Sequence, residues 1–235
     1  MIQVTTIPAL EDNFIYLVRY EPGKALVVDP ADAALVGNEL QQQDLILTTI
    51  LVTHHHYDHI GGVSQLKHRW PCRVIAPDSR IPDLDILTEE QPRITLGKTT
   101  IDVIPTPGHT TSSVCYLITS SSAAAPLIFT GDTLFIGGCG RVVEGAYDAM
   151  YKSLRRIASL PDETILFPGH NYTEENYRFA LTVRPRNTAI KTLLGDIPNA
   201  AEPPSTIARE KQTNIFLLAK GPAEFKKLRL KKDSF

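Results

Sequence analysis

Short apolar runs separated by turns occupy the first 170 or so residues of the chain. Each run has the length and the β-branched or aromatic composition that favour a β-strand. The pattern predicts strands at residues 14–18, 25–28, 46–52, 72–76, 100–104, 114–118, 127–130 and 164–167. The turn at 21–24 predicts that the first two strands pair as a hairpin, and residues 33–43 and 148–160 have the pattern of helices.

Strand-like runs end near residue 170. Helical patterns follow at residues 172–183, 187–194 and 205–218, with breaks at Pro185 and at 196–204. This shift predicts two domains, a β-strand-rich domain at 1–170 and a small α-helical domain at 171–235.

Composition agrees with an ordinary globular protein. The chain has 235 residues, of which 43% are hydrophobic and 21% are charged, and its net charge is -2. That charge gives no general attraction to nucleic acid or to anionic membranes. Basic residues nevertheless crowd the C-terminus: Lys226, Lys227, Arg229, Lys231 and Lys232.

The cysteines and the N-terminus predict a cytoplasmic protein without a membrane partner. Three widely spaced cysteines form neither a disulfide framework nor a CxxC motif. The first residues lack the basic and apolar regions of a signal peptide, and no apolar run approaches the roughly 20 residues of a membrane span.

Polar residues that can bind metal follow four of the predicted strands. The segment 53–59 comes directly after the strand at 46–52 and contains His54, His56, Asp58 and His59. Because neighbouring residues of an extended chain point apart, His54, His56 and Asp58 can share one side while His59 faces a second point. Imidazole and carboxylate groups together are ligands for divalent transition metals, so one loop could serve two ions.

Three further residues occupy equivalent positions. His109 follows the strand at 100–104, Asp132 follows 127–130, and His170 follows 164–167, each with a glycine beside it. Taken alone, each has a simpler explanation, such as a turn or a local hydrogen bond, and segment 53–59 alone could be a surface loop. Their recurrence in order at strand ends favours a metal centre instead, because strand-end loops on a rigid sheet are where catalytic residues gather.

This ordered set resembles the metallo-β-lactamase superfamily in its binuclear form. Within that superfamily, the blocks at residues 7–16, 131–140, 204–214 and 231–235 are similar to the hydroxyacylglutathione hydrolase (glyoxalase II) family. The resemblance covers nearly the whole chain. It implies an α/β fold, a metallo-β-lactamase-like αββα sandwich with a small C-terminal α-helical domain.

The resemblance also implies how the ligands are shared. His54, His56 and His109 would hold one metal ion, Asp58, His59 and His170 a second, and Asp132 would bridge both. The nitrogen and oxygen donors suit zinc, our first expectation, and also tolerate iron or manganese.

The implied activity is hydrolysis of S-D-lactoylglutathione to glutathione and D-lactate, a step of methylglyoxal detoxification. A metal-bridging hydroxide, oriented by Asp58 as the catalytic residue, would attack the thioester carbonyl. We expect a monomer whose partner is this small-molecule thioester.

Glutathione carries two carboxylates, so its thioester requires cationic donors away from the metals. The resemblance places substrate contacts at Arg141, Tyr172, Arg229 and Lys232. The family more often has Lys at position 141 and Tyr at position 143. Arg141 keeps the charge, but Val143 cannot make the phenol hydrogen bond.

Three conspicuous residues are expected to have structural roles. His55 alternates away from the ligands, Asp29 is expected to brace the metal-binding loop, and Cys139 lacks a base partner that would make it a nucleophile.

Other functions fit parts of the pattern. A glutathione persulfide dioxygenase on the same scaffold would need only two histidines and one carboxylate around a single iron. A two-metal phosphodiesterase would use a similar centre, although the chain is acidic overall and has no inserted basic module. A non-catalytic binding module is disfavoured by the intact ligand set.

Overall fold

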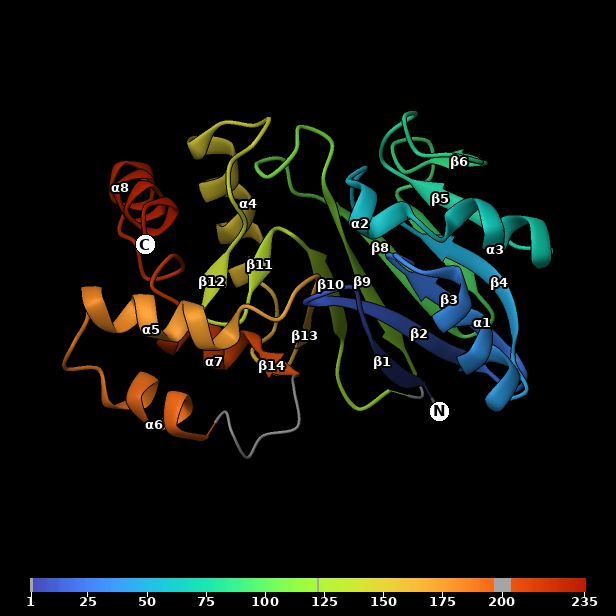
Figure 1. Cartoon of the computed structure of the whole chain (residues 1–235), viewed down its shortest axis with the longest axis horizontal. Coiled ribbons are helices and arrows are strands. Elements are labelled where there is room, and N and C mark those ends of the chain that lie inside the picture. The colour runs from blue at the N-terminus through green and yellow to red at the C-terminus, as the bar shows by residue number, and fades with distance from the viewer. Residues whose placement is uncertain (1, 122, 197–203) are drawn as a thin grey trace.

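The computed structural model describes residues 2–121, 123–196 and 204–235, and two stacked β-sheets form its centre (Figure 1). In this part of the chain the first sheet has six strands in sequence order. The pairs β1–β2 and β2–β3 are antiparallel, and the pairs from β3 to β6 are parallel. These strands are β1 (Gln3–Ala9), β2 (Asn13–Glu21), β3 (Lys24–Val28), β4 (Ile46–Leu51), β5 (Arg73–Ala76) and β6 (Ile86–Leu87).

The second sheet has the order β14-β13-β10-β9-β8-β7. Its members are β7 (Arg93–Leu96), β8 (Thr99–Pro105), β9 (Val114–Ser120), β10 (Leu127–Gly131), β13 (Ile165–Pro168) and β14 (Ser205–Thr206). All neighbours are antiparallel except β10 and β13. A separate short hairpin joins β11 (Leu134–Phe135) to β12 (Gly138–Cys139).

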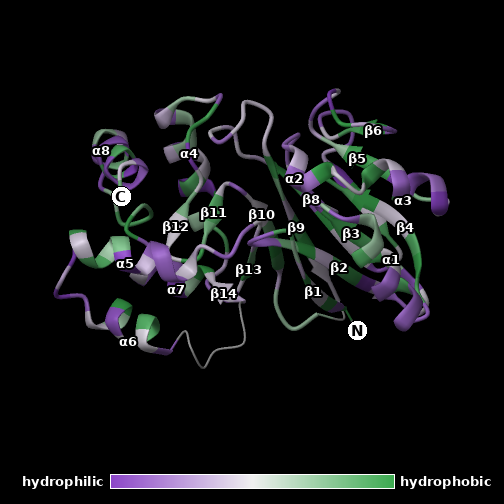
Figure 2. Ribbon diagram, in the orientation of Figure 1, coloured by the Kyte–Doolittle hydropathy of each residue, from purple (hydrophilic) through white to green (hydrophobic). Residues whose placement is uncertain are grey.

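Alternation along the strands produces the layers. In β2, Ile15 and Leu17 face the outer core beneath the helices, whereas Phe14, Tyr16 and Val18 face the core between the sheets. The helices on this outer face are α1 (Ala33–Gln42) and α3 (Val63–Arg69), and the short α2 (Tyr57–Ile60) lies between β4 and α3. Figure 2 shows hydrophobic residues concentrated on the strands and hydrophilic ones on the outer parts of α1 and α3.

The remaining helices cover the other face of the second sheet. They are α4 (Tyr147–Ala158), α5 (Thr173–Val183), α6 (Thr188–Asp196), α7 (Ile207–Thr213) and α8 (Pro222–Asp233). Met150 of α4 and Phe225 of α8 share one hydrophobic core with Ile128 of β10. The order of layers is therefore helix, sheet, sheet, helix, which confirms the predicted αββα sandwich with C-terminal helices. The division into domains at 1–170 and 171–235 stays a prediction.

One predicted helix is wrong in part. Residues 205–218 begin with strand β14 and become helical only over α7 (Ile207–Thr213). The Thr206 hydroxyl accepts the Arg209 N–H and caps the start of α7. The Asn214 side chain accepts the Phe216 N–H and donates to Phe135 and Gly138 carbonyls, so it ends the helix. The predicted break at 196–204 lies almost wholly outside the described residues.

The sheets meet at one edge through backbone hydrogen bonds. The Phe14 N–H donates to Gly169 O at 2.9 Å, and the Asn171 N–H donates to Asp12 O at 2.8 Å. The Val114 N–H donates to Thr53 O at 3.0 Å. This edge, which we call the seam, carries the loops that contain the predicted ligands. No helix of the described residues is long and apolar enough to cross a lipid bilayer.

Candidate metal centre

All seven predicted ligand residues converge at the seam. They form three overlapping groups whose donor atoms lie within 4.8 Å of one another: His54, His56 and His109; His54, His59 and Asp132; and Asp58, His59 and His170. The segment after β4 supplies four of them from the first sheet, and loops after β8, β10 and β13 supply the others from the second sheet.

The first group consists of three imidazoles. His56 Nδ1 lies 3.2 Å from His54 Nε2 and 2.9 Å from His109 Nε2. Burial lowers the pKa of His54 well below its usual value and also lowers the pKa of His56. The rings of His54 and His56 are therefore neutral near pH 7 and offer lone pairs to a cation.

The second group combines two imidazoles with a carboxylate. His59 Nε2 lies 3.3 Å from His170 Nε2. Asp58 Oδ2 lies 3.5 Å from His59 Nε2 and 3.3 Å from His170 Nε2. Although burial opposes its ionisation, contacts with His170 and His59 hold the pKa of Asp58 well below its usual range. Asp58 is therefore a carboxylate at neutral pH.

Asp132 lies between the two groups. Its Oδ1 is 3.3 Å from both His59 Nε2 and His170 Nε2, and its Oδ2 is 3.4 Å from His109 Nε2. Oδ1 is buried and accepts no well-directed hydrogen bond in the described part of the chain. A buried oxygen without such a partner, surrounded by nitrogen atoms, fits a bound cation.

The histidines and carboxylates of the cluster shift one another's pKa values. Burial works against a charged His59, but Asp132 and Asp29 outweigh it and raise the pKa of His59 well above its usual value. Asp132 and Asp58 likewise raise the pKa of His170 to about 10 against the effect of burial. Despite its own burial, Asp132 has a pKa well below its usual value because His59 and His170 face it.

Asp29 braces the loop from behind, as predicted. Its Oδ1 accepts the Thr53 N–H at 2.7 Å. Its Oδ2 accepts the Thr53 hydroxyl at 2.7 Å and lies 3.0 Å from His59 Nδ1. Holding Nδ1 in this way directs Nε2 of His59 into the cluster.

Asp12 and Asn13 brace the second group, and the sequence analysis missed both. Asp12 Oδ1 lies 2.7 Å from His170 Nδ1. Asn13 Nδ2 donates to Asp58 Oδ2 at 3.0 Å and to Asp58 O at 3.1 Å. Both residues belong to the block at 7–16 that carried the family resemblance, and a polar pair between two apolar runs was the signal that could have found them.

Glycine is required where loops approach the cluster. Gly131 has φ +45°, and a Cβ there would lie 2.2 Å from Thr53 Oγ1. A Cβ on Gly169 would lie 2.7 Å from Asp132 Oδ1. A side chain at either position would push apart the segments that carry the ligands.

His109 is held by the loop that contains Arg141. Arg141 O lies 2.8 Å from His109 Nδ1, while the Val143 and Glu144 N–H groups both donate to His109 O at 3.1 Å. The Arg141 side chain is exposed and forms no ion pair within the described chain.

His55 lies outside the ligand groups, as predicted, and is near two carboxylates that both pair with Arg80. Its Nε2 lies 3.2 Å from Glu144 Oε1, and its Nδ1 lies 3.6 Å from Asp78 Oδ2. Arg80 pairs with both carboxylates, at 2.6 Å from Asp78 and 3.1 Å from Glu144. These contacts connect three loops near the metal centre.

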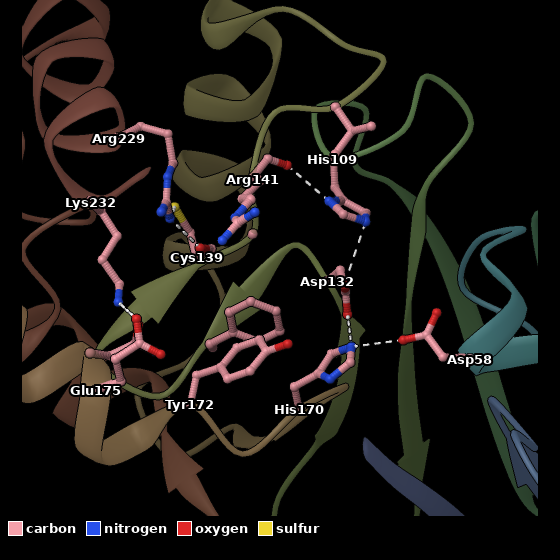
Figure 3. Close-up of a pocket in the computed structure, with 14 residues that line it drawn as sticks. Asp58, His109, Asp132, Cys139, Arg141, His170, Tyr172, Glu175, Arg229 and Lys232 are labelled. Carbon is pink, nitrogen blue, oxygen red and sulfur yellow. Dashed lines mark hydrogen bonds and ion pairs between the residues drawn. The ribbon is translucent and has the colours of Figure 1, made fainter. Parts of the chain in front are cut away.

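A cavity of about 350 Å³ extends from the cluster to α5 and α8 (Figure 3). Its lining includes Asp58, His109, Asp132 and His170 at one end. The four residues predicted to contact substrate also line it: Arg141, Tyr172, Arg229 and Lys232. Residues predicted to bind metal and residues predicted to contact substrate therefore line the same pocket.

Tyr172 forms part of the wall beside the cluster. Its ring stacks on His170 with centroids 4.9 Å apart and 5° between the planes, and it meets the edge of Phe135 at 5.2 Å. Burial raises the pKa of its phenol well above the usual value, so the hydroxyl is a donor at neutral pH.

Helix α8 contributes two cations that already have partners. The buried Arg229 guanidinium lies 2.9 Å from Asp233 Oδ1 and donates to Cys139 O at 2.7 Å. Lys232 forms an ion pair with Glu175 of α5. Burial raises the pKa of the Cys139 thiol to about 11, which agrees with the prediction that it is no nucleophile.

Comparison with known families covers nearly the whole chain. The model of the metallo-beta-lactamase superfamily matches residues 10–85 and 76–170, and the model of the hydroxyacylglutathione hydrolase C-terminus matches residues 171–235.

Individual proteins give the same picture. A hydroxyacylglutathione hydrolase of Chromohalobacter salexigens is 42% identical over 224 residues, which are 92% of this chain and 87% of that protein. The structure of ETHE1 from Myxococcus xanthus is similar with a TM-score of 0.74 and 26% identity, covering 98% of this chain and 90% of that one. The structure of TTHA1623 in a di-iron-bound form has a TM-score of 0.64 and 25% identity, covering 92% of this chain and 100% of that one.

Proposed function

The chain belongs to the hydroxyacylglutathione hydrolase family of the metallo-β-lactamase superfamily, and from this premise we propose that it hydrolyses S-D-lactoylglutathione to glutathione and D-lactate. Membership confirms the resemblance found in the sequence and makes the protein a hydrolase of the thioesterase type. The proposed biological setting is methylglyoxal detoxification.

The observation that carries the proposal is the single pocket that joins the ligand cluster to Arg141, Arg229 and Lys232. A thioester bound there can place its reacting carbonyl at the cluster while its glutathione part reaches the cations. The two carboxylates of glutathione match such donors. Val143, exposed at the pocket wall, offers an apolar contact where the family more often has a phenol.

We assign the ligands to two divalent metal ions. His54, His56 and His109 would hold one ion, Asp58, His59 and His170 the other, and Asp132 would bridge them. The position of Asp132, with one oxygen toward each group, supports this division. The di-iron form of TTHA1623 supports two ions in such a fold. Zinc is the proposed metal, and the same donors accept iron or manganese.

Bound divalent ions would supply a hydroxide nucleophile at neutral pH and would polarise the acyl oxygen. Asp58, ionised and held by Asn13, would orient the attacking hydroxide toward the acyl carbonyl. The Tyr172 hydroxyl donates to the glutathione part of the substrate beside the cluster. The departing thiolate needs no strong acid, because thiols are far more acidic than alcohols.

The test is hydrolysis of S-D-lactoylglutathione, followed by the loss of thioester absorbance, with and without a chelator. We expect turnover that the chelator abolishes and that added metal restores. Absence of chelator-sensitive hydrolysis in metal-loaded protein would refute the proposal. Oxygen consumption with glutathione persulfide, together with one iron per chain, would instead favour the dioxygenase alternative.

We also propose a cytoplasmic monomer. The three cysteines are free and buried, which suits a reducing compartment. Light scattering at micromolar concentration tests the monomer, and a mass near 26 kDa is the expected result.

A further inference from the structure

The ion pair between Lys232 and Glu175 lies at the end of the pocket away from the candidate metal ligands (Figure 3). Lys232 belongs to α8 and Glu175 to α5, so the pair crosses between two helices. Both residues line the cavity. Glu175 is not one of the candidate metal ligands, and it has no role in the proposed hydrolytic step.

The two partners differ sharply in exposure. The Lys232 side chain is only 7% exposed, whereas that of Glu175 is 59% exposed. The rings of Phe179 and Phe235 lie 5.7 Å and 5.2 Å from the Lys232 ammonium and restrict it. The lysine is therefore fixed in the wall, while the glutamate can turn out to solvent.

The other cation of α8 is compensated differently. Arg229 pairs with Asp233, four residues along the same helix. Both partners of that pair belong to α8, and Arg229 also donates to the Cys139 carbonyl. The position of the Arg229 side chain therefore does not depend on α5. Within the described residues, Glu175 is the anion that pairs with Lys232.

A nearly buried ammonium is costly without a counter-ion, because burial removes its hydration. In the free protein Glu175 supplies that counter-ion. A carboxylate of the glutathione group can do the same only after the Glu175 carboxylate has left. Binding at Lys232 then exchanges one carboxylate for another. The favourable free energy of ligand binding is therefore reduced by the loss of the ion pair between Lys232 and Glu175.

We propose that Glu175 is a displaceable counter-ion of Lys232 that competes with the substrate carboxylate and thereby weakens retention of glutathione, the released product. The inference rests on the proposed function, since it takes the ligand to be a glutathione conjugate. Glu175 acts through Lys232 and is a specificity-determining residue, apart from the hydrolytic chemistry.

The test measures binding of S-methylglutathione to metal-loaded protein by isothermal titration calorimetry. The methyl group prevents the sulfur from binding metal as a thiolate. Glu175→Gln should bind this probe about two- to fivefold more tightly than wild type, the range for an exposed ion pair. The matched control is Glu174→Gln, which removes the same charge from the same helix but at a residue that pairs with Arg178. It should bind like wild type.

A double-mutant cycle with Lys232→Met completes the test. If Glu175 acts through Lys232, Glu175→Gln should have no effect in the Lys232→Met background. Weaker or unchanged binding by Glu175→Gln, or an equal change in Glu174→Gln, overturns the proposal. Weaker binding would mean that Glu175 holds the ligand's ammonium group. Hydrolysis of S-D-lactoylglutathione is assayed separately, so a binding shift without turnover would refute the proposed function and leave the counter-ion role standing.

Discussion

Replacing Asp29 by Asn tests how far the metal centre depends on a residue that binds no metal itself. The backbone of Asp29 has φ +51°, a conformation that Asn tolerates as well as Asp does, so the substitution should preserve the local fold. It changes the buried carboxylate that serves Thr53 and His59 into a neutral amide.

The expected magnitude follows from those contacts. The carboxylate has two accepting oxygens, one for the Thr53 N–H and one for the Thr53 hydroxyl and His59 Nδ1. An amide has only one accepting oxygen. The Thr53 hydroxyl can change from donor to acceptor and accept a hydrogen bond from the amide NH₂ group. One buried N–H therefore loses its acceptor, which costs about 1–3 kcal/mol. We expect roughly 10- to 100-fold weaker metal affinity, chiefly at the group that contains His59.

Competition with a chromophoric zinc chelator measures this loss directly. Asp29→Asn should release one ion at a chelator concentration at which wild type retains two. Asp32→Asn is the matched control, because Asp32 caps α1 through the Ala34 and Leu35 N–H groups and Asn caps a helix equally well. If folded Asp29→Asn, judged by circular dichroism, binds both ions within twofold of wild type, the reasoning is refuted.

Three further outcomes are expected. Asp58→Asn should reduce turnover on the order of 10²-fold or more, because it removes the carboxylate proposed to orient the attacking hydroxide; wild-type-like turnover by the metal-replete variant would contradict that role. Tyr172→Phe keeps the stack on His170 but loses a donor, so KM for the thioester should rise about 2- to 10-fold with little change in kcat. Burial raises the pKa of Glu210 above its usual 4.5, and the protonated acid is therefore favoured in the folded state. Its stabilising contribution is complete below the unfolded-state pKa and is lost as pH rises through the folded pKa, so the urea stability of wild type minus that of Glu210→Gln should fall as pH rises above the usual pKa of 4.5. A difference that is flat or rises with pH would contradict this assignment.

The convergence of the candidate ligands was predictable because they all lie in segments that follow strands. Apolar runs indicate where strands end, and the sequence places His109, Asp132 and His170 a short distance beyond three of them. The convergence of these ends follows from the stacking of two sheets, which was predicted from the family resemblance and not from the apolar runs. The family resemblance then supplied the division between two ions.

Residues that act through long-range contacts were not predictable in this way. Asp12 meets His170 across 158 positions, and Asn13 meets Asp58 across 45. The position of this polar pair between two apolar runs marks it as a candidate, but no local pattern shows which distant side chains it contacts. The pairing of Lys232 with Glu175 was hidden for the same reason, because it depends on how α5 and α8 pack. The strand at Ser205–Thr206 exists because β13 offers it an edge, which local helical pattern cannot reveal.

The location of the ligands at the seam has a consequence for folding. His54 and His59 belong to the first sheet, whereas His109, Asp132 and His170 belong to the second, so an ion held by both sets cross-links distant parts of the chain. Such a link closes a long loop, and it can form only after most of the chain has reached its final topology. Binding to the native state alone then stabilises it by mass action. Metal supply should therefore set how often the two sheets separate at this edge, and amide hydrogen exchange near Thr53 and Val114 should slow as the ions are added.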